Sequence, residues 1–85
     1  MTRVDRAWII TTNGKTMLAK WIGGRVVLRE DARTPEDCLN AAIDKGWEAR
    51  FIQWFSMGTK TRDQIEALIP AGQDWEPYAL VTKYE

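Results

Sequence analysis

The chain has 85 residues, so we expect one domain over residues 1–85, with a thin hydrophobic core. Its formal net charge is zero and its apolar share is 45%, which argues against a strongly acidic DNA mimic and against a dedicated, basic DNA-binding protein. Charge is unevenly spread, because residues 1–33 carry seven basic and three acidic side chains (net +4), and residues 34–85 carry five and nine (net −4).

The residue types that usually carry catalysis or bind metal are scarce. Histidine is absent and Cys38 is the one cysteine, which excludes an intramolecular disulfide and a standard zinc site. We interpret Cys38 as a small core residue, and the carboxylate pairs Asp63/Glu66 and Asp74/Glu76 as surface charges. The sequence therefore predicts a protein that is not an enzyme and has no cofactor. Without a signal peptide or an apolar run approaching ~18 residues, we also expect a cytoplasmic protein with no membrane partner.

Two turn signals organise the first third of the chain. Asn13-Gly14 lies between two runs of strand-forming residues, and Gly23-Gly24 follows one run and precedes another. Both pairs are typical of two-residue hairpin loops, in which the turn residues adopt positive φ. We predict three antiparallel strands over residues 6–12, 15–22 and 25–30.

Counting from two-residue loops gives the register. Thr12 then faces Lys15 and Ile22 faces Arg25, and successive residues alternate between the faces of the sheet. One face, which we take as the core face, is uniformly apolar: Trp8, Ile10, Met17, Ala19, Trp21, Val26 and Leu28. The other face mixes aliphatic and basic residues: Ala7, Ile9, Thr11, Thr16, Leu18, Lys20, Ile22, Arg25, Val27 and Arg29.

A helix over residues 35–45 follows. Thr34 is a favourable N-cap, Pro35 suits the first helical position, and Gly46 is the expected stop. Leu39, Ala42 and Ile43 have the spacing of one helical stripe, so we expect them to pack on the core face.

The rest of the chain alternates strand and helix. WEARFIQWFSM reads as a fourth strand, with its helix-facing set at Trp47, Ala49, Phe51 and Phe55. Thr61 is predicted to cap a short helix with a stripe at Ile65, Leu68 and Ile69, and residues 77–84 are predicted as a final strand that Pro77 places at an edge or strand start. The order β-β-β-α-β-α-β predicts an α+β domain with a curved, mostly antiparallel sheet and a helix packed on one face.

The alternate face of the fourth strand is the best functional signal. Joined to the mixed face of the first hairpins, it predicts an exposed aliphatic and basic surface of the kind that forms protein interfaces. The candidate partner-binding residues are Lys20, Arg25, Val27, Arg29, Arg50, Ile52 and Trp54.

Several covers for this surface are compatible with the sequence. The second helix or the last strand, a second copy in a homodimer, and a foreign protein would each bury its apolar residues. A weak single-stranded nucleic-acid binder is a further interpretation, because aromatic residues on a sheet near Lys and Arg are typical of such platforms.

In size and build the chain resembles small phage and mobile-element accessory proteins, including the anti-CRISPR proteins. The resemblance rests on the hairpins TTNGKT and IGGRVV, the capped helix TPEDCLNAAIDKG and the aromatic strand WEARFIQWF. It implies a non-catalytic inhibitor, in the cytoplasm of a bacterial host cell, that binds a CRISPR effector complex and blocks target-DNA binding or nuclease recruitment. Many such inhibitors are acidic, whereas this chain is neutral, so its basic face is expected to meet an acidic protein surface.

Overall fold

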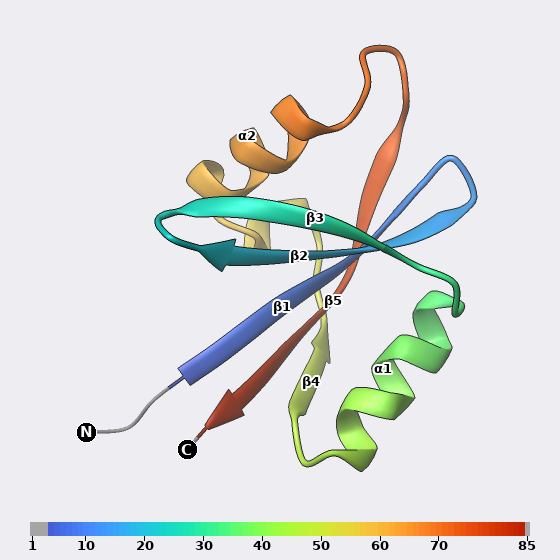
Figure 1. Ribbon diagram of the computed structural model, residues 1–85, viewed down its shortest axis with the longest axis vertical. Coiled ribbons are helices and arrows are strands. Elements are labelled where there is room, and N and C mark those ends of the chain that lie inside the picture. The colour runs from blue at the N-terminus through green and yellow to red at the C-terminus, as the bar shows by residue number, and fades with distance from the viewer. Residues whose placement is uncertain (1–3, 85) are drawn as a thin grey trace.

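The computed structural model describes residues 4–84 and has five strands and two α-helices (Figure 1). Its antiparallel sheet has the order β3-β2-β1-β5-β4, so β3 and β4 are the two edge strands. The elements are β1 (Val4–Thr12), β2 (Lys15–Ile22), β3 (Arg25–Asp31), α1 (Pro35–Asp44), β4 (Glu48–Phe51), the 3₁₀ turn η1 (Trp54–Ser56), α2 (Thr59–Leu68) and β5 (Trp75–Tyr84). The predicted α+β class and element order are confirmed.

The hairpin register predicted from the turns is also confirmed. Thr12 pairs with Lys15 and Ile22 pairs with Arg25. Asn13 and Gly14 have φ values of 50° and 72°, as a two-residue loop with positive φ at both positions requires. The turn chemistry therefore fixed which side chains share a face.

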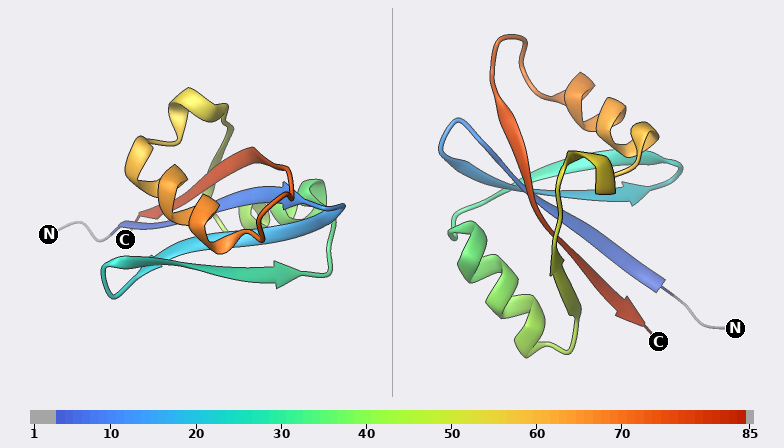
Figure 2. Two further views of the ribbon diagram at one scale, coloured as in Figure 1. Left: turned by 90° about the horizontal axis from the view of Figure 1, so that it is seen from above. Right: turned by 180° about the vertical axis from the view of Figure 1, so that it is seen from behind.

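Each face of the sheet is covered by its own helix (Figure 2). On one face, α2 packs on a core that includes Trp8, Ile10 and Ala19. On the other face, α1 packs on Ala7, Ile9 and Val81. We call these the α2 side and the α1 side.

The expected pairing of faces was wrong. Helix α1 covers the face of Ala7 and Ile9, together with Trp47 and Ala49, whereas the prediction placed it on the face of Trp8. Alternation was correct within the hairpins and within β4. The path of the chain through α1 decided which face of β4 lies on the same side of the sheet as which face of the hairpins. Local periodicity does not specify that path.

The fourth strand is shorter than predicted. It ends at Phe51, after which the chain leaves the sheet and forms η1. Ile52 still donates its N–H to the Tyr78 carbonyl oxygen at 3.2 Å, and its side chain enters the α2-side core. The segment that follows carries Ile52 and Met57 into the core under α2.

A β-bulge in β5 allows residues before and after the bulge to lie on the α2 side of the sheet. Ile9 pairs with Ala79 but Ile10 pairs with Pro77, so Tyr78 is the extra residue. Because one inserted residue shifts the alternation, Trp75 and Leu80 both contact the α2-side core. Pro77 lies in β5, between β1 and β4 in the sheet but outside the segment of β5 that pairs with β4, so its missing N–H removes no bond to β4.

The helices agree with prediction at some positions and not at others. Thr34 is the N-cap of α1 as expected, and its Oγ1 accepts a hydrogen bond from the Asp37 N–H at 3.1 Å. In contrast, α2 begins at Thr59, so Thr61 is not its cap. The buried stripes of both helices differ from the predicted ones, because Ile43 in α1 and Leu68 in α2 are exposed. In α1, Cys38 is buried as predicted and packs beside Leu39.

Candidate functional site

The seven predicted partner-binding residues do not form one surface. Four of them belong to the α1 side of β2 and β3: Lys20, Arg25, Val27 and Arg29. The other three follow the opposite side. Arg50 pairs with Leu80 on the α2 side, and Ile52 and Trp54 belong to the α2-side core or pack against it.

Trp54 and Ile52 therefore do not belong to the candidate partner-binding surface. Ile52 is buried, and Trp54 packs edge-to-face on Trp75. The guanidinium of Arg62 lies 4.7 Å from the centre of the Trp54 ring. The chain itself covers these two side chains, because residues 52–57 fold back over the α2 side instead of continuing the strand.

The α1-side group remains as an exposed patch, which we call the outer face: Lys20, Ile22, Arg25, Val27 and Arg29. Helix α1 packs across β1, β5 and β4, so the end of the sheet at β2 and β3 is left uncovered. Ile22 is 57% exposed and Val27 is 41% exposed. Within residues 4–84, Arg25 and Arg29 have no ion-pair partner, whereas Lys20 contacts Asp5 at 3.2 Å.

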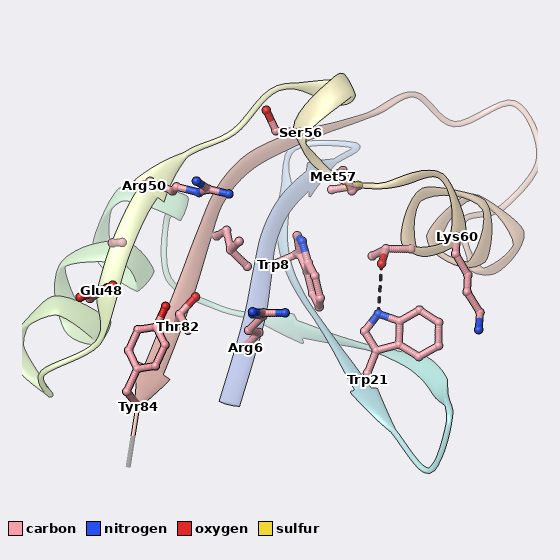
Figure 3. A pocket seen from close by; sticks show the side chains of 13 residues that line it. Arg6, Trp8, Trp21, Glu48, Arg50, Ser56, Met57, Lys60, Thr82 and Tyr84 are labelled. Carbon is pink, nitrogen blue, oxygen red and sulfur yellow. Dashed lines mark hydrogen bonds between the residues drawn. The ribbon is translucent and has the colours of Figure 1, made fainter. Parts of the chain in front are cut away.

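A second candidate lies on the α2 side, in a hollow that we call the sheet pocket (Figure 3). It encloses about 660 Å³ between β4, η1 and α2, over β1 and β5. Its lining includes three cations, Arg6, Arg50 and Lys60, and one acid, Glu48. Among the described residues these three cations form no ion pair, so the pocket is locally positive.

Most aromatic side chains that line the sheet pocket are buried or already contact other residues of the domain. Trp8 is buried. Trp21 donates its Nε1–H to Thr61 Oγ1 at 3.1 Å, and the Lys60 ammonium lies 5.4 Å from the centre of its ring. Tyr84 is exposed, so it is the aromatic lining residue with an accessible ring.

Two exposed phenylalanines were missed by the sequence interpretation, which assigned them to the core. Phe51 is 70% exposed and Phe55 is 84% exposed. Phe51 meets Tyr78 edge-to-face with ring centres 5.3 Å apart, and Phe55 lies in η1. Aromatic residues on both faces of one segment were the available signal, but alternation alone did not show where the strand ends.

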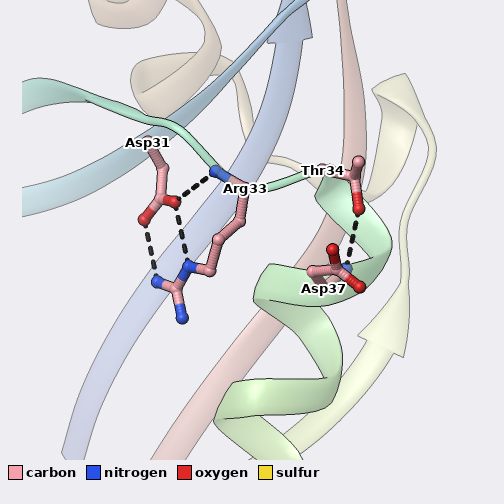
Figure 4. Close-up of polar contacts among 4 residues, drawn as sticks. All are labelled: Asp31, Arg33, Thr34 and Asp37. Atoms are coloured by element: carbon pink, nitrogen blue, oxygen red, sulfur yellow. Dashed lines mark hydrogen bonds and ion pairs between the residues drawn. The ribbon is translucent and has the colours of Figure 1, made fainter.

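A polar cluster joins the end of β3 to α1 (Figure 4). Asp31 accepts two hydrogen bonds from the Arg33 guanidinium, at 2.9 and 2.8 Å, and one from the Arg33 backbone N–H at 2.9 Å. These bonds hold the pKa of Asp31 well below its ordinary value. Burial raises the pKa of the Cys38 thiol, which favours a neutral core residue over a reactive thiolate.

Residues 4–84 contain neither a cluster of the usual metal ligands nor a membrane-spanning helix. No three His, Cys, Asp or Glu side chains in this part of the chain lie close enough to share a metal ion. Neither described helix is long and apolar enough to cross a membrane.

No family model, curated protein or solved structure matches this chain.

Proposed function

We propose that this protein is a non-catalytic binding module that docks on an acidic surface of a partner protein and occludes it. The outer face carries the proposal, because exposed Ile22 and Val27 lie among the unpaired arginines Arg25 and Arg29. Arginine is enriched at protein interfaces, the aliphatic side chains beside it offer apolar area that a partner can bury, and the positive charge favours an acidic partner.

Capture from a bacterial lysate tests this proposal when it is tied to the outer face. The wild-type chain, the double variant Arg25→Glu/Arg29→Glu and the charge-matched control Lys45→Glu/Lys83→Glu serve as baits. We expect a protein retained by the wild type and the control but lost from the outer-face variant, and the same pattern with that protein purified. Equal retention by all three baits would show that the outer face is not the docking surface.

The resemblance to anti-CRISPR proteins supplies a specific candidate for the partner, a bacterial CRISPR effector complex whose target-DNA binding is blocked. A gel-shift assay with a purified effector and labelled target DNA measures this directly. We expect the wild type to reduce DNA binding and Arg25→Glu/Arg29→Glu to restore it. Unchanged DNA binding in excess protein would reject this partner and leave other acidic protein partners open.

The sheet pocket supports a second candidate function, weak binding of single-stranded nucleic acid. Three lining cations would neutralise about three phosphates, and each contributes ~0.7 to the salt dependence. Log K for a labelled twelve-residue oligothymidine should then fall with log salt with a slope of about −2. We expect Arg6→Glu and Lys60→Glu to weaken binding and Lys45→Glu to leave it unchanged. No binding at low salt would exclude this function.

A further inference from the structure

The two edges of the sheet differ in how accessible they are. At β3, the Gln64 side chain of α2 accepts a hydrogen bond from the Val26 N–H at 2.8 Å, so α2 occupies part of that edge. At β4, three of the four residues are exposed, and among described residues β4 pairs with β5 alone. An edge strand with free backbone groups is a template for another strand.

The free backbone groups of β4 can be assigned from its ladder. Ile52 donates its N–H to the Tyr78 oxygen, and Arg50 pairs with Leu80 two residues earlier. Because hydrogen-bonded residues alternate along an antiparallel pair, the residues that alternate with Arg50 and Ile52 in β4 direct their N–H and C=O groups away from β5. These residues are Ala49 and Phe51.

The side chains beside this edge differ on the two faces. Phe51 is exposed on the α1 side, where it contacts Tyr78. Arg50 lines the sheet pocket on the α2 side, with Arg6 from β1 in the same lining. Glu48 lies two residues before Arg50 on the same face and lines the same pocket. An added strand would direct alternate side chains to these two faces, so apolar residues fit beside Ala49 and Phe51, an acidic residue fits beside Arg50, and an uncharged residue fits beside Glu48.

We propose that the free edge of β4 binds an extended segment of the partner protein as a sixth strand. The segment has one acidic residue, beside Arg50, between two apolar residues beside Ala49 and Phe51, and its main chain forms hydrogen bonds to Ala49 and Phe51. Main-chain pairing supplies affinity and the alternate side chains supply specificity in this mode of recognition. The inference rests on the proposed function, since it takes the partner to be a protein.

The position of α1 favours a single extended segment over a second copy of the domain. Helix α1 packs on one face of β4, β5 and β1, where Trp47 and Ala49 contact the α1-side core, and it lies behind β4 in Figure 3. A second copy pairing β4 with β4 about a two-fold axis would bring its own α1 toward the same space. One peptide strand needs only the width of a strand and avoids that collision.

The direct test uses a soluble peptide and the full chain. The acetylated, amidated hexapeptide Thr-Val-Glu-Val-Thr-Val, which places threonine beside Glu48 when its glutamate lies beside Arg50, is titrated into isotope-labelled protein, and amide shifts and hydrogen exchange are recorded by NMR. We expect saturable shifts and at least tenfold slower exchange at Ala49 and Phe51. A peptide with lysine in place of glutamate should bind at least tenfold more weakly. Absence of shifts at β4 with millimolar peptide would overturn the inference.

Two matched changes test the main-chain contacts. Ala49→Pro removes an N–H that points away from β5, so the domain should keep its cooperative unfolding and lose the peptide. In a second experiment that leaves the protein unaltered, N-methylation of the peptide amides on one edge should abolish binding, and N-methylation of the alternate amides should not. Equal binding by both methylated peptides would reject strand addition even if Ala49→Pro fails to fold.

The outcomes separate this inference from the proposed function. Arg25→Glu/Arg29→Glu should bind the hexapeptide like the wild type, because the outer face lies at the other end of the sheet. If that variant loses the partner protein while the wild type ignores the peptide, the outer face stands and the strand inference fails. Sedimentation of the free chain as a dimer that Ala49→Pro converts to a monomer would instead identify a second copy as the occupant.

Discussion

Trp54 packs edge-to-face on Trp75, with ring centres 4.5 Å apart and ring planes at 72°. This contact closes η1 onto β5 and joins two segments that are about 20 residues apart in the chain. It assigns Trp54 to the core, although strand alternation places it on an open surface. The two neighbouring aromatics of η1 therefore have opposite environments, because Phe55 is exposed.

Replacement of these neighbours should separate a structural role from a surface role. Trp54→Ala removes a half-buried ring and its contact with Trp75, so we expect a loss of about 2–3 kcal/mol, below the ~3–5 kcal/mol of a fully buried site. Phe55→Ala, at an exposed position, should change the free energy of unfolding by less than about 0.5 kcal/mol. Urea denaturation measures both. Equal losses in the two variants would contradict this arrangement.

The hydrogen bond from Trp21 Nε1–H to Thr61 Oγ1 links β2 to α2. Thr61→Val keeps the shape of the side chain but leaves the indole N–H without this acceptor, so we expect a destabilisation of about 1–2 kcal/mol. The urea midpoint should fall with an unchanged slope. Thr61→Ser, which retains the hydroxyl, serves as the control and should lose less stability than the valine variant.

The N-cap of α1 gives a third prediction. Thr34→Ala removes the acceptor for the Asp37 N–H and should cost about 1 kcal/mol. Thr59→Ala is a suitable control, because Thr59 begins α2 without a capping role and its side chain is exposed. Thermal unfolding should place the control close to the wild type. An equally large shift for the control would show that capping is not the cause.

The Asp31–Arg33 contact predicts a pH dependence of stability. The folded state holds the pKa of Asp31 well below its ordinary value of 3.8, so the unfolded chain binds the proton more tightly. The contribution is therefore present above pH 3.8 and is lost as the pH falls toward the lower pKa of the folded state.

Comparison with Asp31→Asn isolates this contribution from those of the other carboxylates. The wild type should be more stable than the variant at pH 7, and the difference should shrink as the pH is lowered below about 4. Urea unfolding at pH 7, 4 and 2.5 provides the measurement. A difference that stays constant over this range would mean that ionised Asp31 contributes nothing specific.

The candidate surface could be predicted only in part from the sequence. Arg25, Val27 and Arg29 were placed together correctly because the hairpin turns fixed their register. Arg50 was joined to them through an assumed path of the chain between β3 and β4, and the structure places it on the opposite face. The exposure of Phe51 and Phe55 was missed because an aromatic residue in a strand pattern has no local mark that distinguishes a core position from a surface one.

The sequence by itself determined the two hairpin turns, the register of the first three strands, the cap of α1 and the α+β class, and it gave the outer ends of the first and third strands to within two residues. These features depend on contacts between near neighbours, such as the positive φ of Asn13-Gly14 and the Thr34 hydroxyl beside the start of a helix. Tertiary structure alone decided which helix covers which face, where β4 ends and which edge of the sheet stays open. Those features depend on how distant segments share one small core, in which Ile52 is buried and Trp54 is half-buried because α2 and β5 pack on the same side of the sheet.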